Sequence, residues 1–386
     1  MKKTFVLMIL IAMGCAQVEQ PIAKPTQTTP VKEAVIDSLK HPWSIAFISE
    51  EEVLVSEKDG DLLRVNLESK KKTIIKGFPR DLTDSIRVVY RGDNSGTFEV
   101  RLHPEFQNNR FIYVSYAAKK VGEGKTTKVI RARLEKDSLR DIRTILEAGP
   151  YTRGYYHYGG GMTFGPDKKL YITIGERLFR EIDEPEMPIA QDLTDKRGKI
   201  YRLNPDGSIP DDNPDFGPDA QPGIYAIGIR AAQGIAVDPK SGNVWFSEHG
   251  TRQGDEVNLL KAGANYGWPV ITTGGYRSRD YVPPTIEGAT FTDPKWYWQH
   301  TVAPTGLMFY TGDEFPEWKG DLLVPGLSRG SLWRFRIAND TIQSAEELFV
   351  NNRVRSRKVV QSPEGKLYML TDEPNGKIVR IKNKTI

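Results

Sequence analysis

The sequence predicts an all-β protein, a six-bladed β-propeller, on three observations. One pattern of short apolar strands separated by turns that contain Pro, Asp and Gly recurs six times along the 386 residues. The copies follow one another closely, without the linkers that an array of β-sandwiches would need. One small sheet cannot bury both of its faces, so the copies must stack, and radial stacking around a channel achieves this. The chain is therefore expected to fold as one domain, although its length alone would allow two or three.

Each copy consists of an apolar strand, a turn, a second apolar strand and a strand of alternating arginine and apolar residues. The copies begin at Pro42, Phe98, Gly161, Gln233, Thr305 and Ser356. Longer segments between copies, such as residues 277–300, are expected to form loops on one face of the ring. Ligands commonly bind propellers on that face, over the mouth of the channel.

The N-terminal residues 1–15 are expected to be a lipoprotein-type signal peptide. Two lysines precede the apolar run "TFVLMILIAMG", which ends at Cys15, the single cysteine of the chain. Lipid on Cys15 would anchor an exported protein on the periplasmic side or at the cell surface, and would be its one contact with the membrane. An ordinary signal peptide with an incidental cysteine is the alternative. Residues 16–37, rich in Pro, Thr and Gln, are expected to form a flexible tether, and residues 38–386 the propeller domain.

The composition of the chain excludes several functional classes. Apolar residues make up 38%, with 35 glycines and 25 prolines, which is typical of a soluble, turn-rich globular protein. Charges of both signs are mixed along the chain and the formal net charge is +4, so no nucleic-acid partner is indicated. The sequence contains no nucleophile elbow, phosphate-binding loop, zinc-binding helix motif or Cys/His cluster. Redox chemistry would therefore need a cofactor that is held in some other way.

His157 is the histidine that sequence reasoning singles out. Three glycines, Gly159–Gly161, follow it closely and remove side chains where a ligand or another backbone could approach. A catalytic base and a structural histidine in a tight turn both fit this pattern. The other histidines precede a proline in the early copies, where we interpret them as structural, or lie at loop ends: His41, His103, His249 and His300.

Carboxylates are concentrated in one glycine-rich loop. Glu248, Asp255 and Glu256 lie in it, and the backbone carbonyls near Gly250 and Tyr266 are available as further oxygen donors. Hard oxygen ligands of this kind suit calcium, although the spacing differs from that of an EF-hand. A solvated acidic turn is the alternative.

Seven stretches distributed over the six copies, in the same order, give the chain a clear resemblance. They are "LHPEFQNNRFIYVSY", "HYGGGMTFGPDKKLYITIGE", "GKIYRLNPDGSIPDDNP", "IYAIGIRAAQGIAVDP", "DEVNLLKAGANYGWP", "TVAPTGLMFYTGDEFPEWKGDLLVP" and "NNRVRSRKVVQSPEGKLYMLTD". In these stretches the chain resembles the glucose/sorbosone dehydrogenase family, whose members include soluble quinoprotein glucose dehydrogenases and aldose sugar dehydrogenases. The family has the six-bladed propeller fold.

The resemblance implies a site for pyrroloquinoline quinone (PQQ). His157 stands where the family has its general base, and Arg230 where an arginine contacts the reacting carbonyl of the cofactor. Arg353 and Arg355 match two arginines that hold the carboxylates of PQQ. The further cofactor contacts that the resemblance implies are Asn94, Glu176, Gln233 and Thr301.

The resemblance also implies two calcium sites. Carbonyls of Gly250 and Thr251 would hold the calcium that polarises the quinone, whereas Glu256 and the carbonyl of Tyr266 would hold a separate, structural calcium. The chain departs from the family pattern at several positions. Ala231 replaces an asparagine, Gly161 an arginine or other large residue, Glu176 an aspartate and Ser328 (beside Arg329) a lysine, and Asn94 stands near the usual glutamine.

The expected function is that of a PQQ-dependent, calcium-containing dehydrogenase of aldose sugars or related alcohols. His157 would take the hydroxyl proton while hydride passes to the quinone. A periplasmic or membrane acceptor would then receive the electrons. The alternatives are a non-catalytic binding propeller of the same family, as its hedgehog-interacting relatives exemplify, and a calcium-dependent lactone hydrolase.

Overall fold

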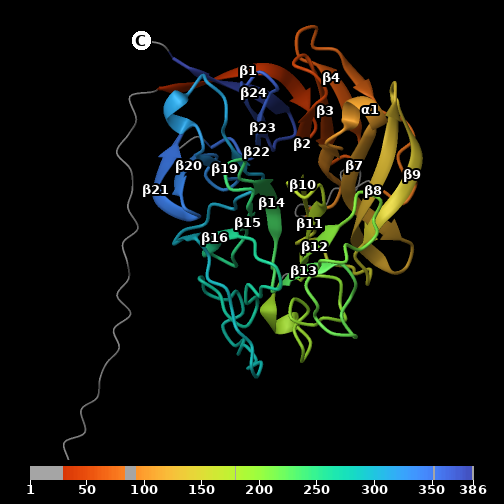
Figure 1. The fold of residues 1–386 in the computed structure, drawn as a ribbon, viewed down its shortest axis with the longest axis vertical. Helices are drawn as coiled ribbons and strands as arrows, with labels where there is room; N and C mark the ends of the chain where they lie inside the picture. Colours follow the sequence, from red (N-terminus) through yellow and green to blue (C-terminus); the bar gives the residue numbers. More distant parts are fainter. Residues whose placement is uncertain (1–28, 83–92, 179, 351–352, 385–386) are drawn as a thin grey trace, which may run out of the picture.

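The computed structural model describes residues 29–384 except 83–92, 179 and 351–352. Its strands form six four-stranded antiparallel sheets arranged radially around a central axis (Figure 1). The predicted six-bladed β-propeller is thus confirmed. The predicted signal peptide and the lipid-anchor residue Cys15 lie outside the described residues. Within those residues, no helix has the length and apolar character needed to cross a bilayer.

Each blade follows one copy of the sequence pattern, and its first strand is the innermost. Blade 1 contains β2 (Pro42–Phe47), β3 (Glu52–Glu57), β4 (Leu62–Asn66) and β5 (Lys72–Ile74). Blade 2 contains β6 (Thr97–Leu102), β7 (Phe111–Lys120), β8 (Gly124–Glu135) and β9 (Ser138–Glu147). Blade 3 contains β10 (Gly159–Phe164), β11 (Leu170–Ile174), β12 (Lys199–Leu203) and β13 (Ile224–Ile227).

The second half of the ring repeats this order. Blade 4 contains β14 (Ala232–Val237), β15 (Val244–Glu248), β16 (Asp255–Leu259) and β17 (Trp296–Trp298). Blade 5 contains β18 (Met308–Phe309), β19 (Leu322–Pro325), β20 (Leu332–Ala338) and β21 (Thr341–Leu348). Blade 6 contains β22 (Ser356–Gln361), β23 (Leu367–Thr371), β24 (Gly376–Asn383) and β1 (Pro30–Leu39). Short helices lie in the connections: α1 (Phe106–Asn109), η1 (Glu181–Asp183) and η2 (Pro316–Trp318).

Blade 6 combines the two ends of the chain. Its outer strand β1 pairs with β24 from Pro30↔Asn383 to Leu39↔Gly376, and Figure 1 shows the two strands side by side. The expectation that residues 30–37 belong to a flexible tether is therefore wrong. Ile36 and Leu39 are buried in a core cluster shared with blades 1 and 6, and this burial stabilises the strand.

Neighbouring blades are joined by a recurrent hydrogen bond. A hydroxyl on the second strand of a blade donates to a backbone carbonyl on or near the inner strand of the next blade. Ser115 donates to Gly160 (2.6 Å), Thr173 to Ala232 (2.9 Å), Ser247 to Thr305 (2.9 Å) and Ser56 to Phe98. A buried hydroxyl is costly without a partner, so these bonds favour one alignment of each blade on the next.

Apolar side chains fill the spaces between the blades. The cluster between blades 4 and 5 includes four tryptophans, Trp245, Trp296, Trp298 and Trp333, and the cluster between blades 1 and 2 is mainly aliphatic around Leu54 and Ile112. Burying one such aliphatic side chain contributes about 1.5–3 kcal/mol. Adjacent blades are therefore held together by contacts between the faces of their sheets. The loops at the strand ends are not needed for this packing and can form a site.

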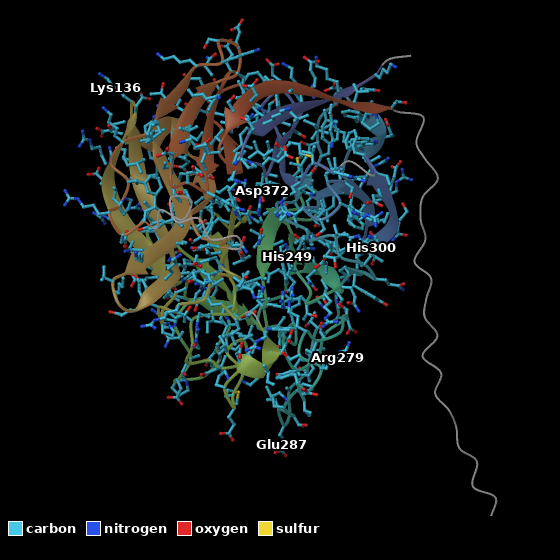
Figure 2. The ribbon with its side chains drawn as sticks, turned by 180° about the vertical axis from the view of Figure 1, so that it is seen from behind. Lys136, His249, Arg279, Glu287, His300 and Asp372 are labelled. Carbon is cyan, nitrogen blue, oxygen red and sulfur yellow. The ribbon has the colours of Figure 1, made fainter. Side chains whose placement is uncertain are left out.

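All inner strands run in the same direction through the ring, which decides where the site lies. Residues just before each inner strand therefore gather at one mouth of the central channel. His157 lies two residues before β10, Arg230 two before β14, and Arg355 one before β22. Figure 2 shows Asp372 and His249 near the centre of the ring, and Arg279 and Glu287 toward its edge.

Candidate active site

His157 and Glu176 form a close pair at this mouth. The Nδ1 atom of His157 lies 2.6 Å from Oε1 of Glu176, whose side chain is 1% exposed. The other carboxylate oxygen of Glu176 accepts the backbone N–H of Leu178. When Glu176 is ionised, His157 donates through Nδ1 and its Nε2 carries the free lone pair that a base needs. Glu176 therefore orients His157 in the way that a carboxylate orients the histidine of a catalytic pair.

The local backbone explains the glycines after His157. His157 itself is left-handed (φ 53°), and Gly159 and Gly160 continue with φ of 71° and 90°. Gly161 has another role, because a Cβ atom there would lie 2.6 Å from the carbonyl oxygen of Gln233 in the next blade. The absence of a side chain at Gly161 therefore lets blades 3 and 4 approach each other. A widened ligand pocket is not needed to explain it.

Burial and nearby arginines set the protonation of the pair. Burial lowers the pKa of His157 well below its ordinary value, and the positive charges of Arg230 and Arg177 lower it further. Burial also raises the pKa of Glu176 to about 8, against the opposing effect of Arg230. The imidazole is therefore neutral near pH 7, and the ionised form of Glu176 becomes populated as the pH approaches 8.

Arg230 is fixed beside this pair by four contacts. Its Nη1 donates to the carbonyls of Gly250 (2.7 Å) and His249 (3.2 Å), and its guanidinium lies 5.0 Å from the ring centre of Trp268. Its backbone N–H donates to Glu248 (2.9 Å). The Nε atom of Arg230 is buried and makes no hydrogen bond within the described residues. The Nε donor of Arg230 is thus not used by any described residue and is left for a ligand at the channel mouth.

Arg177 is a site residue that sequence reasoning missed. It is 2% exposed and has φ of 72°, an unusual backbone conformation for a side chain of its size. Its guanidinium lies 3.5 Å from the ring centre of Tyr158 and donates to the carbonyls of Gly154 (2.7 Å) and Tyr156. Arg177 thus holds the loop that carries His157. No signal in the "GER" motif distinguishes this role from that of a surface arginine.

A second cluster surrounds Asp372 at the same mouth. The carboxylate lies 2.5 Å from Arg357, 3.2 Å from Lys58, and 3.3 Å from both Arg355 and His41. Because two permanently charged guanidinium groups, those of Arg355 and Arg357, share one carboxylate and Lys58 also contacts it, cations outnumber the carboxylate of Asp372. These cations hold the pKa of Asp372 well below its usual value.

Arg355 and Arg357, rather than the predicted pair Arg353 and Arg355, are the arginines that the structure brings together. Arg355 and Arg357 meet at Asp372, and Arg357 also donates to Oε1 of Gln233 at 2.6 Å. Arg353 precedes the first residue of β22 by three positions and, within the described residues, makes no ion pair with Asp372. The motif "RVRSR" contains two overlapping R-x-R pairs, and only the position at which the strand begins decides between them.

The predicted calcium loop is organised by Asp255. One oxygen of Asp255 accepts the N–H of Gly250 (2.8 Å), and the other accepts the N–H groups of Val302 and Ala303 (2.7 Å each). Thr251 is 4% exposed, and its hydroxyl donates to the Gly275 carbonyl. Asp255, one of the three carboxylates that the sequence placed in this loop, therefore shapes the backbone whose carbonyls were predicted as ligands.

A small cavity of about 20 Å³ lies beside this loop, between two buried carboxylates. Glu248, Glu256, Gly250 and Tyr266 are among its lining residues. Burial raises the pKa of Glu248 to about 8 and that of Glu256 to about 7, and the negative charge of Glu256 adds to the first effect. Its volume holds about one water or one cation. In the part of the chain that the structure describes, no three acidic or histidine side chains gather as a metal-ligand set, so backbone oxygens would have to complete a cation site.

The remaining predicted residues lie at the rim or under it. Asn94 is exposed, and its N–H donates to Tyr155 (3.0 Å) in the loop before His157. Thr301 is exposed and donates through its hydroxyl to the Arg252 carbonyl. Ala231 is fully buried, so its methyl group is packed beneath the site. The structure thus brings together His157, Glu176, Arg230, Gln233 and Arg355, and adds Arg177 and Arg357.

These features define a six-bladed propeller with a histidine–carboxylate pair and a cation-rich cluster at one mouth of its channel. The chain belongs to the Glucose / Sorbosone dehydrogenase family, whose sequence profile matches residues 39–380. The resemblance stated from the sequence is thereby confirmed.

Two relatives and one solved structure illustrate this membership. The chain is 32% identical to aldose sugar dehydrogenase YliI of Escherichia coli (strain K12), over 98% of each protein. It is 29% identical to quinoprotein glucose dehydrogenase B of Acinetobacter calcoaceticus, over 88% of this chain and 85% of that protein. The crystal structure of the soluble E. coli aldose sugar dehydrogenase in its apo-form matches with a TM-score of 0.82 at 31% identity, covering 92% of this chain and all of that one.

Proposed function

We propose that this protein is a PQQ-dependent dehydrogenase that oxidises aldose sugars or related alcohols. The observation that carries the proposal is the His157–Glu176 pair, 2.6 Å apart, at the same channel mouth as Arg230 and the Asp372 cluster. Membership of the dehydrogenase family supports the reaction class. The names of the relatives support a sugar substrate and a quinone cofactor.

The donor set at the channel mouth fits a planar, multiply carboxylated cofactor. Arg355 and Arg357 share a single carboxylate, that of Asp372, so their positive charge is only partly compensated among the described residues, which favours an anionic ligand. The Nε atoms of Arg230 and Arg357 are buried and make no hydrogen bond within the described residues. We therefore assign the cofactor's carboxylates to Arg355 and Arg357, and its reacting carbonyl to Arg230. Bound PQQ would supply a two-electron acceptor for hydride.

The protein's own residues would move the proton. The Nε2 atom of neutral His157 takes the proton of the substrate hydroxyl, and the Glu176 carboxylate stabilises the imidazolium that forms. Arg177 keeps the His157 loop in place during this step through its bonds to Gly154 and Tyr156. Arg230 provides positive charge where negative charge develops on the acceptor.

Calcium is part of the proposal at two places. The carbonyls of Gly250 and Thr251 would hold the ion next to the cofactor, in the loop that Asp255 organises. Glu256 and the carbonyl of Tyr266 would hold the structural ion, at the small cavity beside Glu248. Two buried carboxylates with raised pKa values suit a divalent cation there, because the cation would compensate their charge.

One experiment tests the central proposal. The purified chain is titrated with PQQ and calcium, and aldoses are then added with an artificial electron acceptor. We expect PQQ binding and turnover, and we expect His157→Ala to abolish turnover while PQQ still binds. His103→Ala, a histidine just beyond the far end of inner strand β6, is the matched control and should keep turnover. Absence of PQQ binding at micromolar concentration would overturn the proposal, and binding without turnover would favour a non-catalytic propeller.

We also propose that the protein is exported and lipid-anchored at Cys15, with a periplasmic or membrane electron acceptor. The apolar run that ends at the only cysteine supports this. Expression of the full chain and of Cys15→Ser, followed by membrane fractionation and mass analysis of the N-terminus, tests it. Equal partitioning of both forms into the soluble fraction would overturn it.

A further inference from the structure

A large cavity opens at the other mouth of the central channel. Its volume is about 520 Å³, within the range of small-molecule pockets of about 300–1,000 Å³. All six inner strands contribute to its walls, mainly through residues in their C-terminal halves. The wall residues include Phe47, Leu102, Thr163, Val237, Phe309 and Val360.

This cavity is separate from the His157 site. The site residues precede the inner strands, whereas the cavity residues lie toward the ends of the same strands. A six-residue strand spans about 20 Å at about 3.3 Å per residue. Glu99 and Lys358, both buried and bonded at 2.7 and 2.9 Å, lie in the middle of strands β6 and β22. A buried ion pair therefore stands between the two mouths of the channel.

The inner end of the cavity is positively charged. Lys358 and Arg101 both line it, and they share the single carboxylate of Glu99, which also accepts a hydrogen bond from Ser44. Arg101 uses its Nε for the Met162 carbonyl (2.8 Å) and for Glu99 (3.0 Å). Its terminal nitrogens make no hydrogen bond among the described residues, and its side chain is 30% exposed. A two-pronged donor is thus available at the end of a mostly apolar cavity.

We propose that this cavity binds a small amphiphilic carboxylate, with the carboxylate on Arg101 and a hydrocarbon body along the apolar walls. The planar guanidinium of Arg101 matches a carboxylate through two parallel N–H donors. The apolar walls favour a hydrocarbon over a sugar, because sugar hydroxyls would lose water there without gaining partners. This site is independent of the proposed dehydrogenase activity.

Isothermal titration of the full chain with sodium octanoate tests the proposal, and sodium hexanoate and decanoate test the apolar contribution. Affinity is expected to rise about fourfold for each added methylene, the fold-change that corresponds to burial of one CH₂. Octan-1-ol, which lacks the charge, is expected to bind at least tenfold more weakly than octanoate.

Two variants probe the two halves of the site. Arg101→Gln is expected to weaken octanoate binding at least tenfold, and Arg143→Gln, an exposed arginine on β9, is the matched control with unchanged affinity. Met308→Trp places a larger side chain in the wall and is expected to block octanoate without affecting Arg101. Both variants should keep the circular dichroism spectrum and the urea midpoint of the wild type, which separates loss of this site from unfolding and does not depend on PQQ binding. Absence of saturable octanoate binding, or equal affinity in wild type and Arg101→Gln, overturns the proposal.

Discussion

Replacing Glu176 by glutamine keeps the shape of the His157–Glu176 pair and removes its charge. The amide oxygen can still accept from Nδ1 of His157, which lies 2.6 Å from the carboxylate. The imidazolium that forms during proton transfer would no longer be stabilised. General acid–base groups contribute about 10²–10⁴-fold to rate, so kcat is expected to fall by at least about 100-fold, or about 2.7 kcal/mol.

The same substitution is expected to change the pH dependence of activity. In the wild type, kcat/KM should rise as the pH passes about 8, because only ionised Glu176 leaves Nε2 of His157 free to act as a base. Glu176→Gln has no such titration, so this rise should disappear. Steady-state kinetics of the PQQ-loaded enzyme from about pH 6 to about pH 9.5 would measure this pH dependence of kcat/KM in both forms.

Stability is expected to change in the opposite direction to activity. The pKa of Glu176 is raised in the folded protein from 4.5 to about 8, so the fold is favoured fully below pH 4.5 and loses this contribution as the pH rises to about 8. The corresponding free energy is about 3–5 kcal/mol. Glu176→Gln lacks this titration. The free energy of unfolding of the variant, relative to that of the wild type, should therefore increase between about pH 5 and about pH 8.5, measured by urea unfolding of the apo-protein.

Glu135→Gln, an exposed carboxylate at the end of β8, is the control and should leave both measurements unchanged. The reasoning fails if Glu176→Gln retains the wild-type kcat and the rise near pH 8. It also fails if the stability difference between Glu176→Gln and wild type does not depend on pH.

Three further predictions concern the arginines and the ring closure. Arg357→Gln should raise the Kd for PQQ more than tenfold, measured by fluorescence titration, whereas Arg353→Gln should change it less than threefold; the reverse order would restore the pair predicted from the sequence. Arg177→Gln should lower kcat with little change in KM, because it frees the loop that carries His157, and Arg177→Lys should recover part of the loss; equal kcat in all three forms would show that the loop needs no such support. Ile36→Ala should cost about 2–4 kcal/mol in urea unfolding, since Ile36 is 1% exposed in the core of the closing blade; a cost below about 0.5 kcal/mol, typical of surface sites, would mean that β1 contributes little to closure.

Much of the fold was predictable because the strand pattern is local. Each blade is encoded by apolar alternation and turn residues within one copy, so the number of blades could be counted. The strand β1 could not be found in this way, because its partner β24 lies at the other end of the chain and residues 30–37 follow a Pro- and Thr-rich segment. The sequence pattern gave three strands in every copy, whereas each blade has four, so the sixth copy did not stand out as lacking its outer strand.

The position of a site residue was predictable where the sequence motif also fixes where the residue lies on an inner strand. His157, Arg230 and Gln233 lie where the motif put them, at the start of inner strands. Arg357 was not predicted because its contact with Asp372 depends on where β22 begins, and the sequence alone does not decide between the two overlapping R-x-R pairs. Arg177 was missed because its contacts are with backbone carbonyls of a loop that precedes it by about one β-hairpin.

The pairing of β1 with β24 also constrains how the protein can fold. Pro30 and Asn383 pair across 353 positions (383 − 30 = 353), so this seam of the ring closes only after β24 has been made. Contacts of such long range slow folding, because the entropy of closing the loop must be paid before the contact forms. Until then, the apolar faces of blades 1 and 6 that pack against each other are exposed to other chains. A circular permutant that joins residues 30 and 383 and opens the chain at another loop would move this long-range seam to a different blade.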